Sequence, residues 1–212
     1  MPFSRNPLQH SAAFRRRRVF NWLPLGLTYA FLYMARYNLT VSKNALGPLM
    51  SKEAFGIIFA AGTITYAFSF LINGPLTDRI GGKRAILIGA AGSAVMNGVM
   101  GLLVLGILEW GWSLNLTLAF SITYAMNMYF QSYGAVAIVK VNSSWFHVRE
   151  RGVFGGIFGI LISLGLYFAF DWSQAIVNWT EAVNPEHPQY WLVFFVPAAI
   201  LVFWFILDLF VL

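Results

Sequence analysis

The sequence predicts an all-α membrane protein with six transmembrane helices, and three features of the chain lead to this prediction. Of its 212 residues, 58% are hydrophobic and only 10% are charged, whereas a soluble domain carries roughly 25% charged residues. Six stretches are apolar over about the 20 residues that a membrane-spanning helix needs. Basic residues gather in alternate connections between these stretches. The composition therefore excludes both a soluble globular domain and a disordered chain.

The predicted spans divide the chain into a short basic segment and a helical unit. Residues 1–19 form the basic amino-terminal segment, and residues 20–212 form the six-span unit. The first span is too long for a cleavable signal peptide, whose apolar core has roughly 7–15 residues. The connections are short, except for residues 171–189. The predicted spans cover approximately residues 20–46, 55–76, 85–108, 114–139, 152–170 and 190–212.

The distribution of basic residues predicts which way the spans point. With the amino terminus in the cytoplasm, the inner side holds eleven basic residues and the outer side only Lys43 and Lys52. Basic residues collect on the cytoplasmic side of membrane proteins. We therefore expect an integral protein of the cell (inner) membrane with both termini in the cytoplasm. The inner residues are Arg5, Arg15, Arg16, Arg17, Arg18, Arg79, Lys83, Arg84, Lys140, Arg149 and Arg151.

The composition also limits the partners of the chain. The tract from Arg15 to Arg18 is expected to touch anionic lipid rather than nucleic acid, because the next residues enter the bilayer. With no cysteine, thiol catalysis, disulfides and thiolate metal sites are excluded. No arrangement of catalytic residues, metal ligands or cofactor contacts is recognisable, so we expect a protein that is not an enzyme.

The chain ends at Leu212, where the sixth span ends. This leads us to expect either one half of a larger transporter or a truncated, inactive product. A lone half would expose polar stripes to lipid. We therefore expect it to need a carboxyl-terminal half or a second copy of itself as a partner.

Arg36 is the most informative residue, because it lies deep inside the first predicted span. An arginine at the bilayer centre costs roughly 2.5–3.5 kcal/mol or more. At 100° per residue, a polar face of this helix contains Tyr29, Tyr33, Arg36, Thr40 and Lys43. No acidic residue of another span lies at a matching depth. The guanidinium fork suits a phosphate, carboxylate or sulfate anion. The alternative is an arginine satisfied by backbone carbonyls or by a partner outside this chain.

Other spans carry weaker polar patterns. Tyr66 in the second span and Gln131 in the fourth lie on stripes that either line a hydrated cavity or join helices by hydrogen bonds. The glycines of the fifth span are expected to serve close helix packing more than ligand contact. The three histidines lie outside the spans, and no carboxylate lies at mid-membrane in the first five. Exchange of one anion for another therefore fits better than proton coupling. The fifth-span glycines are Gly152, Gly155, Gly156 and Gly159.

The connection after the second span resembles the inner-loop signature of the major facilitator superfamily. In that signature a glycine is followed four residues later by Asp-Arg and then by glycine and basic residues. The glycines permit a tight turn, and the aspartate can cap a helix or bind an arginine. The matching residues are Gly74, Asp78, Arg79, Gly82, Lys83 and Arg84. The resemblance implies the amino-terminal half of that fold, built from two inverted three-helix units.

Within that superfamily the chain is similar to the organophosphate:phosphate antiporters. The resemblance rests on the spacing of Tyr29, Tyr33 and Arg36, on Tyr66 and Gln131, and on an aromatic turn that ends in Arg149, Glu150 and Arg151. It implies that Arg36 grips the substrate phosphate, together with an arginine from a carboxyl-terminal half. It also implies that the tyrosines and Gln131 line the same cavity and that the inner turns act in gating.

The resemblance implies transport of a sugar phosphate or glycerol phosphate in exchange for inorganic phosphate. Three positions depart from the glycerol-3-phosphate carriers, because Tyr37 and Phe70 stand in place of lysines and Ile162 in place of a histidine. These departures make the site less basic and leave a larger sugar phosphate or a related organic anion open. A non-transporting sensor of sugar phosphates is the alternative function.

Overall fold

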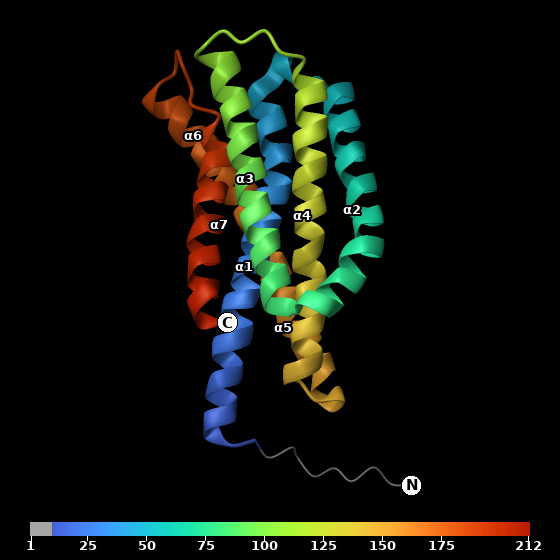
Figure 1. Cartoon of the computed structure of the whole chain (residues 1–212). Coiled ribbons are helices and arrows are strands. Elements are labelled where there is room, and N and C mark those ends of the chain that lie inside the picture. The colour runs from blue at the N-terminus through green and yellow to red at the C-terminus, as the bar shows by residue number, and fades with distance from the viewer. Residues whose placement is uncertain (1–9) are drawn as a thin grey trace.

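The computed structural model describes residues 10–212 as an upright bundle of long helices (Figure 1). Arg5 and the rest of residues 1–9 lie outside the described part of the chain. Short turns η1 (Gly47–Leu49) and η2 (Val148–Glu150) and a π-helical segment η3 (Phe168–Trp172) connect some of the helices. The helices are α1 (Ala12–Leu46), α2 (Lys52–Ile80), α3 (Gly82–Leu108), α4 (Leu116–Trp145), α5 (Arg151–Tyr167), α6 (Ser173–Val183) and α7 (Leu192–Val211).

Residues 171–189, expected as a long connection, are helical for most of their length. The helix of α5 continues through η3 and α6 and ends at Val183. No glycine or proline occurs between Gly165 and Pro185, so nothing in the backbone breaks the helix there. The π-helical segment is anchored by Phe168, whose ring stacks on Phe31 of α1 at 4.8 Å between centroids. The non-helical part of this connection is therefore limited to residues 184–191.

Four of the helical segments are long and apolar enough to cross a membrane, judged by length and composition. They are Lys52–Ile80, Gly82–Leu108, Val148–Val183 and Leu192–Val211. Helices α1 and α4 are as long but more polar, because α1 contains Arg36 and four arginines near its start and α4 contains several amides. Both helices bury polar residues inside the bundle, including Arg36 and Asn38 of α1 and Asn127 and Gln131 of α4. Because α5, η3 and α6 form one continuous helix, residues 10–212 contain six long helices, as predicted. Length and composition support a membrane span for four of these helices.

Helix α1 lies at the centre of the bundle. It packs against α5 and η3, α7, α4 and α3, whereas α2 packs mainly against α4, and α3 packs against α4 and α7. Leu25, Ala30, Leu32 and Met34 of α1 are fully buried. Tyr33, Tyr37 and Thr40 of α1 are only half-buried.

Two glycines allow helices to approach closely. A Cβ at Gly165 of α5 would lie 2.7 Å from the carbonyl oxygen of Ala30 in α1. A Cβ at Gly62 of α2 would overlap the ring of Tyr124 in α4. By contrast, a Cβ added at any of the four exposed glycines expected to serve packing would meet nothing within 4 Å: Gly152, Gly155, Gly156 and Gly159. Inside the described chain these four glycines do not pack against another helix, and their role in packing stays a prediction.

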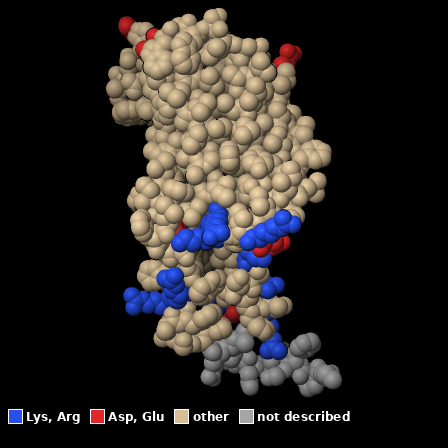
Figure 2. All heavy atoms as spheres, in the orientation of Figure 1, with Lys and Arg blue, Asp and Glu red and all other residues tan. Residues whose placement is uncertain are grey.

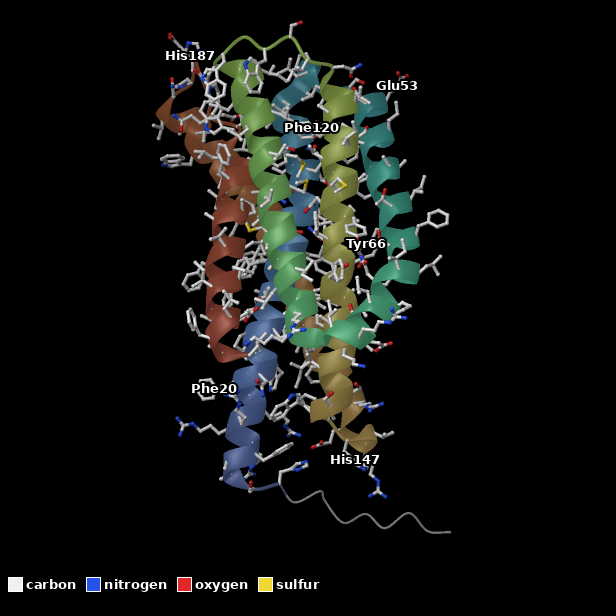
Figure 3. The ribbon with its side chains drawn as sticks, in the orientation of Figure 1. Phe20, Glu53, Tyr66, Phe120, His147 and His187 are labelled. Atoms are coloured by element: carbon white, nitrogen blue, oxygen red, sulfur yellow. The ribbon has the colours of Figure 1, made fainter. Side chains whose placement is uncertain are left out.

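Charged residues concentrate at the end of the bundle that carries the start of α1 and the α4–α5 turn (Figure 2). We call it the basic end. Figure 3 shows Phe20 and His147 near this end, and Glu53 and His187 at the opposite end. Three ion pairs occur among residues 10–212: Lys140–Asp78, Arg18–Glu150 and His10–Glu150. All three lie at the basic end, so no ion pair of the described residues lies in the middle of the bundle.

Candidate functional site

Arg36 lies in the middle of the bundle and is 6% exposed. Its Nε donates a hydrogen bond of 2.7 Å to Oε1 of Gln131 in α4. Its guanidinium carbon lies 4.9 Å from the ring centroid of Tyr33 and 4.5 Å from that of Tyr66 in α2. The guanidinium is thus held by one amide oxygen and two aromatic faces, each of which attracts a cation.

The Arg36 guanidinium retains an unused donor. Its Nη2 is buried and has no hydrogen-bond partner. None of the ion pairs of residues 10–212 includes Arg36, and the buried carboxylate of Asp208 accepts instead from Thr28 at 2.7 Å. A buried cation without a carboxylate is costly. The expected alternative, satisfaction by backbone carbonyls, is not observed for Nη2.

The structure brings most of the predicted site residues to Arg36. Tyr33, Tyr66 and Gln131 contact it directly. Tyr29 is buried one turn before Tyr33 in α1, and the two rings pack edge-on with their centroids 5.2 Å apart. Tyr66 lies about half-way along the bundle (Figure 3). Thr40 is half-buried one turn away from Arg36, and in the described part of the chain no hydrogen bond joins the two.

Three side chains of α4 hold the segment of α1 that carries Arg36. The hydroxyl of Tyr124 donates to the carbonyl of Arg36 at 3.3 Å. Nδ2 of Asn127 donates to the carbonyl of Ala35 at 3.0 Å. Gln131 binds the guanidinium itself. Since these residues are spaced by three and four, they share one face of α4.

Behind this face lies a set of fully buried amides that sequence reasoning missed. Asn97 of α3 donates to the carbonyl of Ala35 at 3.0 Å. Asn38 of α1 donates to Oδ1 of Asn97 at 2.9 Å and to the carbonyl of Val193 at 3.0 Å. We call Asn38, Asn97 and Asn127 the asparagine network. The available signal was the position of Asn127, on the same stripe as Tyr124 and Gln131.

The residues expected to act in gating lie at the basic end. Asp78 pairs with Lys140 of α4 at 2.7 Å rather than with an arginine. The turn between α2 and α3 uses Gly81 with φ = +86°, a conformation that favours glycine. Next to it, Gly82 lets α3 approach α4, since a Cβ there would lie 2.6 Å from Val141. Gly74 has open space around it.

Several other basic-end residues join distant parts of the chain. Lys83 donates to the carbonyl of Leu209 in α7 at 2.9 Å. Glu150 accepts two hydrogen bonds of 3.1 Å from Arg18 of α1. Arg151 contacts the carbonyl of Ser143 at 3.4 Å. Arg79 and Arg84 are exposed.

The sequence profile of the Major Facilitator Superfamily matches residues 25–212, which is most of the chain. The chain belongs to this superfamily. Because the superfamily consists of membrane transporters, the prediction of a protein that is not an enzyme is confirmed. The profile match supports the half-fold predicted from the inner-loop signature.

Curated relatives place the chain near the organophosphate transporters. The glycerol-3-phosphate transporter of Bacillus subtilis is 27% identical over 175 residues, which cover 77% of this chain and 38% of that protein. The membrane sensor protein UhpC of Escherichia coli is 24% identical over 71% of this chain and 32% of its own length. A probable hexose phosphate transport protein of Chlamydia trachomatis is 25% identical over 71% of this chain and 30% of its own length.

The matches thus span about a third of the length of these relatives and lie in their amino-terminal part. No solved structure matches the chain significantly. The predicted resemblance to the amino-terminal half of organophosphate transporters is confirmed at the level of the family.

The three departures from the glycerol-3-phosphate carriers surround the site with aromatic and apolar groups. Phe70 packs edge-on against Tyr66 at 4.8 Å. The ring centroids of Tyr37 and Tyr33 lie 6.0 Å apart. Ile162 packs against the buried core. Among the described residues at this level of the bundle, Arg36 is therefore the cation that faces α2 and α4.

Proposed function

We propose that this chain forms one half of a transporter for phosphorylated organic anions, such as sugar phosphates or glycerol phosphate, that exchanges them for inorganic phosphate. The observation that carries the proposal is the buried Nη2 of Arg36, which lacks a partner while Gln131, Tyr33 and Tyr66 fix the rest of the guanidinium. An arginine fork binds phosphate with two parallel hydrogen bonds. The relatives described as a glycerol-3-phosphate transporter and a hexose phosphate transport protein support the choice of substrate class.

The proposal includes a partner and an orientation. The half-buried side chains of α1, Tyr33, Tyr37 and Thr40, would close against a carboxyl-terminal half or a second copy, and the two halves would rock around the site. The exposed glycines of α5 supply a flat surface for such a contact. The basic end would face the cytoplasm of the cell (inner) membrane, with both termini there.

The test is exchange of radiolabelled phosphate in liposomes that contain the complete transporter. Arg36→Ala should abolish exchange. Arg36→Lys should reduce it at least about tenfold, because an ammonium keeps the charge but lacks the fork. Arg17→Ala, which removes an exposed arginine outside the site, should leave exchange unchanged. Normal exchange by Arg36→Ala would refute the assignment.

A sensor is the second candidate, because the E. coli relative is described as a membrane sensor protein. Binding of glucose 6-phosphate without any exchange in the same liposomes would favour the sensor. Exchange that depends on Arg36 would favour the transporter.

A further inference from the structure

Asn127 stands directly behind the residue that holds the Arg36 guanidinium. It lies four residues before Gln131 in α4 and is fully buried. Nε2 of Gln131 donates to Oδ1 of Asn127 at 3.5 Å, the longest bond of this group. Residues four apart on a helix face one another, so the two amides interact along the axis of α4.

This contact selects the orientation of the Gln131 amide. With Nε2 directed at the Asn127 oxygen, Oε1 of Gln131 is directed at Nε of Arg36, which donates to it at 2.7 Å. The reversed amide would place NH₂ against the guanidinium and oxygen against oxygen. Both contacts would be repulsive, because two N–H donors would face each other at Arg36 and two oxygen acceptors would face each other at Asn127.

Asn127 is itself fixed from two sides. Its Nδ2 donates to the carbonyl of Ala35. Its Oδ1 also accepts from Nδ2 of Asn97 at 3.4 Å, and Asn97 is held by Asn38 and the carbonyl of Ser93. The asparagine network therefore links α1, α3, α4 and the carbonyl of Val193 in α7 to the site. Movement of Asn127 would break its hydrogen bonds with Ala35 of α1 and Asn97 of α3.

We infer that Asn127 is a positioning residue of the anion site, which acts through Gln131 to hold the Arg36 guanidinium with its Nη2 edge free for the anion. This inference rests on the proposed function. Binding sites lose affinity when the residues that support the contacting groups are loosened. Without Asn127 the Gln131 amide loses the partner of its Nε2, so its Oε1 is held less firmly against Nε of Arg36.

The experiment measures the Kd of radiolabelled inorganic phosphate by equilibrium dialysis with the complete, purified transporter. Asn127→Ala should raise the Kd about tenfold, as the loss of an outer hydrogen-bond partner does at other sites. In a Gln131→Ala background the same substitution should change the Kd by less than about twofold, because the residue through which it acts is absent. Asn127→Ser, too short to reach Gln131, should reproduce the loss if Asn127→Ala does not fold.

The matched control is Asn73→Ala. Asn73 of α2 is also a fully buried amide that joins two helices, since Nδ2 donates to Oγ of Ser132 in α4 at 2.7 Å. It is not connected to Arg36, so its removal should lower thermal stability and leave the Kd unchanged. An unchanged Kd in Asn127→Ala, an equal loss in the Gln131→Ala background, or an equal loss in Asn73→Ala would overturn the positioning role. A wild-type protein that binds no phosphate would overturn the proposed function, and the positioning role would fall with it.

Discussion

At the scale of single residues, the arrangement around Arg36 explains how a charge can reside in the middle of an apolar bundle. Neutral groups support it: one amide oxygen and two aromatic rings. These groups partly compensate the desolvation of the cation without neutralising it. A carboxylate in their place would neutralise the guanidinium, which the proposed anion site requires to be unpaired.

Gln131→Glu tests this reasoning. The new carboxylate would lie where Oε1 now accepts from Nε of Arg36 at 2.7 Å, and the internal ion pair would compete with any anion. We expect the protein to fold with unchanged or higher thermal stability and to bind inorganic phosphate at least about ten times more weakly. Gln174→Glu, an exposed position in α6, changes the net charge equally and should keep the affinity. Wild-type affinity in Gln131→Glu would contradict the account.

A second interaction between single residues, the ion pair of Arg18 and Glu150, lies at the basic end. Glu150 receives two hydrogen bonds from Arg18, whose guanidinium also lies 4.8 Å from the ring of Phe146. The side chains of Arg18 and Glu150 are 16% and 24% exposed, so solvent screens the pair only in part. The pair ties the beginning of α1 to the α4–α5 turn.

Glu150→Gln should therefore loosen the beginning of α1. The amide loses the ion pair with Arg18 but keeps the size of the side chain. We expect faster backbone hydrogen exchange over residues 12–19, measured by mass spectrometry, with little change over the middle of α1. Glu53→Gln at the opposite end should leave this segment unaffected. Equal protection of residues 12–19 in Glu150→Gln and wild type would show that the pair does not hold the helix.

At the scale of helices, the position of α5 against α1 depends on one glycine. The backbone of α1 at Ala30 and the Cβ of Tyr33 leave no room for a side chain at Gly165. Because Tyr33 contacts Arg36, this approach also sets one wall of the site. A backbone carbonyl yields less readily than the end of a flexible side chain.

Gly165→Ala should separate α5 from α1 and destabilise the protein by about 1–3 kcal/mol. Gly159→Ala is the control on the same helix, because a Cβ there meets nothing within 4 Å. Alanine is a better helix former than glycine by roughly 1 kcal/mol, so the control should be neutral or stabilising. Thermal unfolding of both variants in detergent distinguishes them. Equal unfolding midpoints would mean that the close approach is not required.

At the scale of the whole molecule, the separation of charge along the bundle defines its two ends. Lys and Arg collect at one end, and the opposite end carries few charges (Figure 2). Such a separation fixes orientation in a membrane, since basic segments remain on the cytoplasmic side. The inverted relation of two three-helix units, and the position of the spans in the bilayer, stay predictions.

The absence of cysteine in the chain makes the orientation testable. Ser113→Cys lies in the exposed α3–α4 connection, and Ser143→Cys is exposed near the end of α4 at the basic end. In intact cells a membrane-impermeant maleimide should label Ser113→Cys, and it should label Ser143→Cys only after permeabilisation. The reverse pattern would invert the proposed topology.

The local chemistry of the sequence determined much of the architecture of the protein. Length, apolarity and the placement of basic residues determined six long helices and a bundle with one basic end, because a bilayer tolerates few alternatives. A lone arginine among tyrosines predicted the candidate site, because an unpaired charge is costly in a bilayer. Helix periodicity also placed Tyr124 and Gln131 on one face, which is a local property of the backbone.

Only the tertiary structure decided which groups meet across helices. The pairing of Glu150 with Arg18, the pairing of Asp78 with Lys140 and the hydrogen bond from Asn127 to the carbonyl of Ala35 join residues far apart in sequence. The helical continuation to Val183 likewise depends on packing of η3 against α1. Such contacts depend on the rotation and offset of each helix against its neighbours. These quantities are set by the sum of many side-chain fits and not by any local pattern.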